Sequence, residues 1–141
     1  MRGLRFPGVA AVVLGLAGCG QVEDAWMLGS SSAAANDQIM LVRKDPPSFG
    51  FQRLALQTRV YPDLAVFTSR HGLPDFLAET GNQERRYFIL YYLKARRAYA
   101  CRTHSGNRQA IEFAGPYPIT PREFRLLDGF RRDPSHQPPK L

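Results

Sequence analysis

The chain has 141 residues, of which 44% are hydrophobic and 22% are charged. This length suffices for one small domain with a modest core and excludes two domains of ordinary size. Lys and Arg number 19 against 12 Asp and Glu, giving a net charge of +7. A basic chain attracts nucleic acid, anionic lipid head groups or an acidic protein face, or its charge serves only solubility. Composition alone leaves these alternatives open.

The N-terminal residues follow the pattern of a secretory signal. Arg2 and Arg5 supply positive charge, and residues 6–18, FPGVAAVVLGLAG, form an apolar run. This run is far shorter than the roughly 20 residues that a membrane-spanning helix needs. We therefore expect a signal peptide over residues 1–18, the alternative being a cytosolic protein with an apolar first helix.

A cysteine ends this segment. Residues 16–19, Leu-Ala-Gly-Cys, resemble the lipobox of bacterial lipoproteins. The resemblance implies that Cys19 is lipidated, that cleavage occurs before it, and that the acyl chains form a lasting membrane anchor. Gly20, in place of the Asp that retains many lipoproteins in the inner membrane, implies sorting to the outer membrane, facing the periplasm. Nucleic acid is then not an expected partner, and Cys101 has no disulfide partner.

Composition divides the rest of the chain. Residues 28–37, LGSSSAAAND, are small and polar, so we expect residues 19–37 to be a lipidated N-terminus and flexible tether. Residues 131–141, RRDPSHQPPKL, are rich in proline and poor in apolar residues, and we expect a disordered tail. Residues 38–130 remain as a single α+β domain.

The first half of this domain gives mixed signals. Residues 38–44, QIMLVRK, are typical of a short strand, while residues 49–60, FGFQRLALQTRV, are ambiguous between strand and loop. Pro62 is suited to the first position of a helix, which we expect over residues 62–71. Gly72 would end that helix in a left-handed conformation.

The next segments predict an antiparallel meander. Pro74 favours an extended start, and four segments read as strands separated by short turns: residues 74–80, 85–93, 97–103 and 108–114. In the first, Phe76 and Ala78 would share one face and Leu77 and Glu79 the other. The second, RRYFILYYL from Arg85, is apolar enough to predict a central strand covered on both faces.

Residues 119–131 predict a helix that covers the sheet. Thr120 is placed as N-cap with Pro121 at the first helical position and Glu123 as its capping-box partner. The helix would end near residues 129–131, and its apolar face would contain Phe124, Leu126, Leu127 and Phe130. The fold class predicted is thus α+β: a small antiparallel sheet of three to four strands packed with two helices.

Catalytic constellations are not apparent. Asp63 and Glu123 suit helix starts, Glu79 and Glu112 fall at strand positions expected to face water, and Asp75 suits a turn or cap. The three histidines lie far apart, and no Cys/His pair has metal-ligand spacing. We therefore expect no catalytic residues, no metal, no cofactor and no enzymatic activity.

Basic residues surround a pair of tyrosines. Tyr91 and Tyr92 lie in one predicted hairpin, whose two ends carry Arg85, Arg86, Lys94, Arg96, Arg97 and Arg102. Tyr and Arg are enriched where protein surfaces meet. We select Tyr91, Tyr92, Arg96 and Arg97 as candidate partner-binding residues, with a solvated, functionally neutral rim as the alternative.

Residues 60–114 resemble the SmpA/OmlA, or BamE-like, family of small outer-membrane lipoproteins. The resemblance rests on Gly72-Leu73-Pro74-Asp75 after a helix and on Tyr91-Tyr92-Leu93 in the following aromatic strand. It implies a lipid-anchored accessory subunit of the machinery that assembles β-barrel proteins, with an envelope protein as partner. The family has a helical pair before its strands, of which residues 56–72 show little, and the helix from Thr120 is not expected there. The alternatives are a lipoprotein that contacts anionic lipid and an inhibitor-type envelope lipoprotein.

Overall fold

A computed structural model describes residues 39–81, 84–104, 106, 109–134 and 141. The predicted signal peptide, Cys19 and the tether lie outside the described residues, as do residues 135–140 of the predicted tail. The described chain is an α+β domain, which confirms the predicted fold class. Its elements follow the order β1 (Ile39–Leu41), α3 (Phe49–Val60), α4 (Pro62–His71), β2 (Phe76–Gly81), β3 (Arg86–Tyr92), β4 (Arg97–Thr103), β5 (Ile111–Pro118) and α5 (Pro121–Arg132).

The strands form one antiparallel sheet in the order β1-β2-β3-β4-β5. β3 is the central strand and is covered on both faces, as its apolar sequence predicted. The sheet has five strands rather than three to four, because β1 pairs with β2 and the whole meander joins it. β5 runs to Pro118, past the predicted end at Ala114. The pairing of β5 with β4 is irregular between Ala98 and Ala100, and β5 continues past Gly115, whose φ is 117°.

α3 resolves the segment that the sequence left ambiguous between strand and loop. Ser48 is its N-cap, and the hydroxyl accepts a hydrogen bond from Phe51 N at 3.2 Å. The buried positions of α3 include Leu54 and the polar Gln57, whereas Leu56 and Val60 are exposed. The apolar residues therefore do not mark one face, and the helical period is obscured in the sequence.

α4 has the predicted bounds, Pro62–His71. Gly72 ends it with a φ of 80° and a ψ of 179°, so the residue has the expected positive φ but not the left-handed helical conformation. α5 begins with the predicted capping box between Thr120 and Glu123 and ends at Arg132, just past the predicted region. Leu141, at the end of the predicted tail, packs half-buried against the core beside α5.

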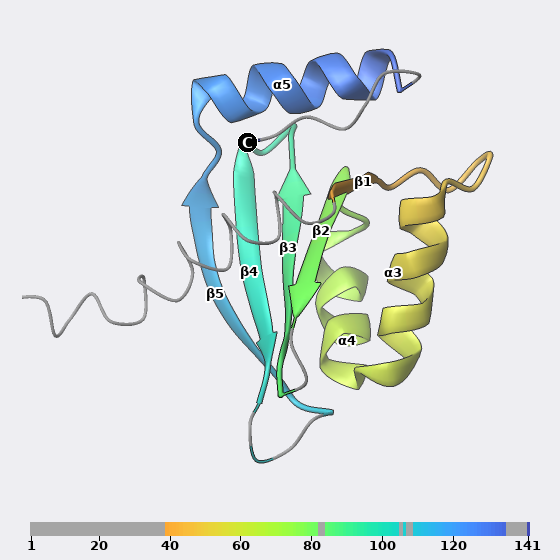
Figure 1. Ribbon diagram of the computed structural model, residues 1–141, viewed down its shortest axis with the longest axis vertical. Coiled ribbons are helices and arrows are strands. Elements are labelled where there is room, and N and C mark those ends of the chain that lie inside the picture. Colours follow the sequence, from red (N-terminus) through yellow and green to blue (C-terminus); the bar gives the residue numbers. More distant parts are fainter. Residues whose placement is uncertain (1–38, 82–83, 105, 107–108, 135–140) are drawn as a thin grey trace, which may run out of the picture.

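The sheet separates two apolar cores (Figure 1). We call α3 and α4 the helix pair; the pair packs on one face, over a core that contains Leu54, Leu64, Phe88 and Cys101. α5 lies across the upper end of the sheet in Figure 1 and packs on the opposite face through Leu127. In the part of the chain that the structure describes, no helix is long and apolar enough to cross a membrane.

Candidate functional site

The structure divides the four candidate partner-binding residues between different surroundings. Tyr91 is 2% exposed and belongs to the core beside α5, while Tyr92 points to the opposite face, because consecutive strand residues alternate. The hydroxyl of Tyr92 donates to the carbonyl oxygen of Gly72 at 2.9 Å. The guanidinium of Arg96 lies 3.8 Å from the ring centre of Phe124 on α5. The two tyrosines therefore do not form one exposed patch.

Tyr92 instead belongs to a larger aromatic group on the side of the helix pair. Phe67 of α4 stacks on His71 at a ring distance of 4.0 Å and on Phe113 of β5 at 4.7 Å. Tyr99 of β4 meets Phe67 edge-on at 4.9 Å and Tyr92 at 5.9 Å. We call this group the aromatic surface; its members are Phe67, His71, Tyr92, Tyr99 and Phe113. One helix and three neighbouring strands contribute to it.

The aromatic surface reaches solvent and has a basic border. Phe113 is 37% exposed, His71 is exposed, and the other rings are half-buried. Arg97 is exposed and pairs with Tyr92 across β3 and β4, and Arg70 is exposed on α4 beside His71. Burial raises the pKa of Tyr92, so its hydroxyl remains a neutral hydrogen-bond donor. The arrangement combines apolar area with cations, as binding surfaces for proteins do.

Sequence reasoning found two residues of this border and surface, Tyr92 and Arg97, and missed the rest. Tyr99 lies two residues after Arg97 and therefore on the same strand face. Phe67 and His71 are four residues apart on α4 and so lie on the same side of the helix. These spacings were visible, but the position of α4 against β4 and β5 was not.

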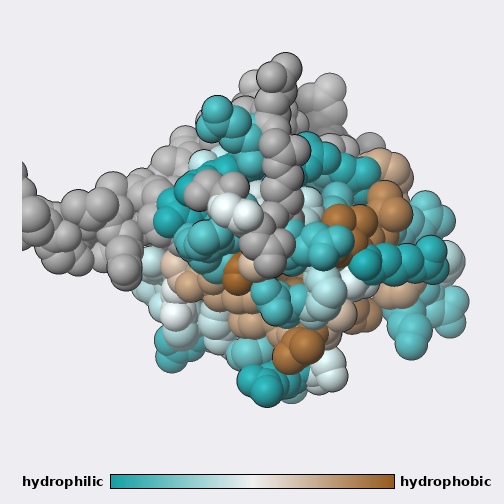
Figure 2. Space-filling view, turned by 90° about the horizontal axis from the view of Figure 1, so that it is seen from below, coloured by the Kyte–Doolittle hydropathy of each residue, from teal (hydrophilic) through white to brown (hydrophobic). Residues whose placement is uncertain are grey.

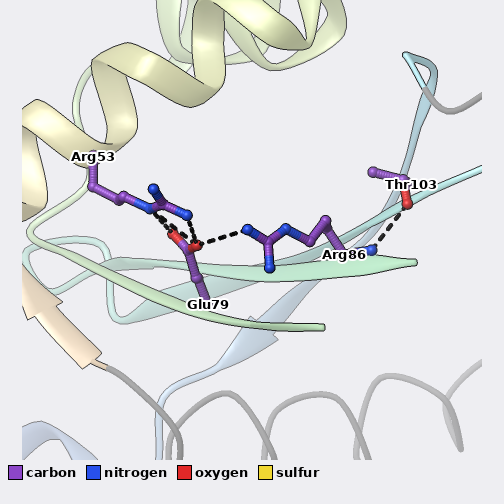
Figure 3. Close-up of polar contacts among 4 residues, drawn as sticks. All are labelled: Arg53, Glu79, Arg86 and Thr103. Atoms are coloured by element: carbon purple, nitrogen blue, oxygen red, sulfur yellow. Dashed lines mark hydrogen bonds and ion pairs between the residues drawn. The ribbon is translucent and has the colours of Figure 1, made fainter. Parts of the chain in front are cut away.

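Glu79 corrects a second expectation. It was expected to face water, but it is 4% exposed and lies beneath α3. Nε of Arg53 donates to the two carboxylate oxygens of Glu79 at 3.0 and 2.9 Å, and Arg86 approaches at 3.7 Å (Figure 3). The hydrogen bond to Glu79 raises the pKa of Arg53. The backbone N–H of Arg86 donates to Thr103 Oγ1 at 3.0 Å, so the network links α3 to three strands.

The other carboxylates have structural partners. Asp75 Oδ2 accepts a hydrogen bond from Leu93 N at 2.7 Å, and Asp63 Oδ2 accepts one from Ile111 N at 3.1 Å. Glu112 lies 2.6 Å from Arg102 Nε, and this hydrogen bond lowers the pKa of Glu112. Among the described residues no group of three His, Cys, Asp or Glu side chains could hold a metal ion.

Cys101 is fully buried in the core beneath the helix pair, as expected for a small apolar side chain. Burial raises the pKa of its thiol, which keeps it protonated and disfavours thiolate chemistry.

Comparison with known proteins adds no relative: no family model matches the chain, and searches of curated proteins and solved structures gave no match. The function is therefore inferred from the surfaces of the domain and from the sequence motifs.

Proposed function

We propose that the chain is a lipid-anchored, periplasm-facing accessory protein of the bacterial outer membrane, which acts by binding an envelope protein and has no catalytic activity. The observation that carries the proposal is the aromatic surface with its basic border. Exposed aromatic side chains beside arginine are typical of the centres of protein interfaces. The anchor is inferred from the lipobox at residues 16–19.

The most concrete form of the proposal is a subunit of the β-barrel assembly machinery. It is supported by the SmpA/OmlA resemblance, in which a helical pair precedes the strands. α3 supplies the first member of such a pair, which the sequence had not suggested. α5 remains a departure from the resemblance, so the pairing of helices supports the proposal at the level of fold only.

The partner expected has an apolar patch with an acidic rim. Phe113 on β5 offers apolar contact area, and Val66 on α4 (51% exposed) and Leu73 just after α4 (46% exposed) are further exposed apolar side chains. Arg70 and Arg97 would meet carboxylates, because guanidinium groups match carboxylate geometry. Charged contacts at the rim of an interface contribute more to specificity than to affinity.

Site-specific photocrosslinking in living cells tests this proposal. The photoreactive residue p-benzoylphenylalanine replaces Phe113 in one variant and Leu56 in a matched control, since Leu56 is 47% exposed on the outer side of α3. We expect the Phe113 variant, and not the control, to form an adduct with a subunit of the barrel-assembly complex. Equal adducts from both positions, or none from position 113, would contradict a docking role for the aromatic surface.

A further inference from the structure

The outer face of α5 is basic along its length. Residues 122, 125, 129 and 132 are exposed and follow helical spacing, while Leu127 on the opposite side is buried against the sheet. These four positions are Arg122, Arg125, Gly129 and Arg132, and Pro121 and Arg131 of the same helix are exposed as well. A 12-residue helix is about 18 Å long, so the three arginines at these positions form an extended row rather than a point.

The turn between β3 and β4 adds to this row. Arg96 of the turn lies over the ring of Phe124, and its carbonyl oxygen accepts a hydrogen bond from Ile119 N at 3.0 Å. These two contacts fix the turn beside the start of α5. Lys94 in the same turn is exposed. We call Lys94, Arg96, Arg122 and Arg125 the basic end of the domain.

Acidic side chains near the basic end are already engaged. Glu123 caps the helix, and Asp128 pairs with Arg131 at 2.7 Å and Arg132 at 2.9 Å. Within the described part of the chain, Arg122 and Arg125 take part in no ion pair. Their charges therefore remain open to an external anion.

The basic end also differs in kind from the aromatic surface. No exposed large hydrophobic side chain of the described residues belongs to α5 or to residues 93–96. The end opposite α5, in contrast, shows hydrophobic side chains exposed between hydrophilic ones (Figure 2). A protein interface usually needs buried apolar anchors, whereas a row of cations without them suits a surface that carries many anions.

The proposed lipid anchor makes a membrane the anionic surface nearest to the domain. The described chain begins with β1, whose Leu41 pairs with Phe76, and the ring of Phe76 lies 5.9 Å from that of Phe130 on α5. β1 and α5 thus share one core (Figure 1). The chain therefore enters the described domain at the β1 edge, near the C-terminal part of α5, whereas the basic end lies at the start of the same helix. The expected tether, residues 19–37, is long enough for the basic end to reach a membrane that holds Cys19.

We propose that the basic end binds the phosphate groups of an anionic membrane surface and so orients the anchored domain. This inference rests on the proposed lipid anchor. Each cation near such a surface contributes a small attraction that salt screens. The anchor raises the effective concentration of lipid, so weak contacts suffice to orient the domain.

Vesicle co-sedimentation of the full chain tests the proposal. Phosphatidylcholine vesicles with and without phosphatidylglycerol are compared, so that apolar insertion of the N-terminus appears in both. Attraction of Arg2 and Arg5 to the anionic lipid is the same in every variant and cancels when the variants are compared. The test variant is Arg122→Gln/Arg125→Gln. The control is Lys44→Gln/Arg59→Gln, which removes the same charge from exposed positions just before α3 and near its end, outside both proposed surfaces. Circular dichroism establishes that both variants are folded.

We expect the excess binding to anionic vesicles to fall about 30-fold in the α5 variant, to change little in the control, and to disappear at high salt. An equal loss in both variants would show attraction by net charge alone and would overturn the proposal. If the unmodified chain shows no excess binding to anionic vesicles, the proposal is also overturned. The basic end would then serve another anionic partner, such as an acidic protein. The assay contains no protein partner, so its outcome is independent of the Phe113 crosslink.

Discussion

Among the described residues, Glu79 is the most deeply buried charged residue, 4% exposed. Its carboxylate is buried and is held by Arg53, whose side chain is 27% exposed. Removing one member of a buried ion pair leaves the other charge poorly solvated and costs about 3 to 5 kcal/mol. We expect Glu79→Gln to lower the free energy of unfolding by about 3 kcal/mol, the lower end of that range, because Arg53 retains some contact with water. Urea unfolding followed by circular dichroism measures this.

Glu112→Gln is the matched control. Glu112 also pairs with an arginine, Arg102, but its side chain is 38% exposed. Solvent weakens such pairs, and the expected cost is below about 1 kcal/mol. Equal costs for the two substitutions would contradict the role assigned to burial at Glu79.

At the scale of elements, two helical glycines have opposite roles. Gly50 lies where α3 crosses β1: a Cβ atom there would overlap the carbonyl oxygen of Leu41 and lie 2.9 Å from Met40 Cβ. A Cβ at Gly129 of α5 would meet no heavy atom within 4 Å. We expect Gly50→Ala to destabilise the domain by about 1 to 3 kcal/mol, because the helix must move away from the sheet. Gly129→Ala should stabilise it by about 0.5 to 1 kcal/mol, because alanine favours the helix.

Thermal unfolding of the two variants checks this pair of predictions. Shifts of opposite sign are expected. Unchanged or raised stability of Gly50→Ala would mean that α3 does not pack on β1 as closely as the structure shows, and a loss of stability in Gly129→Ala would contradict the open space around Gly129.

The three helices differ in how far their sequences reveal them. α5 is predictable because its capping box, proline and apolar spacing are local signals that agree. α4 is predictable from Pro62 and Gly72, which mark its ends. α3 was not, since its buried Gln57 and exposed Leu56 contradict the usual pattern and its burial is decided by contact with β1 and β2.

The candidate site was predictable only in part for a similar reason. Tyr92 and Arg97 are neighbours in one hairpin, so the sequence places them together. Phe67 and Phe113 are 46 positions apart, and only the packing of α4 across β4 and β5 joins them. The choice of Tyr91 beside Tyr92 reflected sequence adjacency, whereas strand geometry sends the two rings to opposite faces.

At the scale of the whole molecule, the two proposed surfaces lie on different parts of the domain. The basic end is formed by α5 and the β3–β4 turn, and the aromatic surface by α4 with β3, β4 and β5. If α5 faces the membrane, the aromatic surface remains accessible to a partner, because it is formed on the other face of the sheet. One small domain would then contact lipid and protein at the same time.

The lipid anchor at Cys19 is the central claim, since the compartment, the partner class and the orientation all depend on it. The most direct measurement is mass spectrometry of the N-terminal peptide from membranes of cells that express the chain, compared with a Cys19→Ala variant. We expect the mature chain to begin with a lipid-modified Cys19, and the variant to retain residues 1–18 as an unprocessed precursor. An unmodified Cys19, or normal processing and membrane retention of the variant, would contradict the claim.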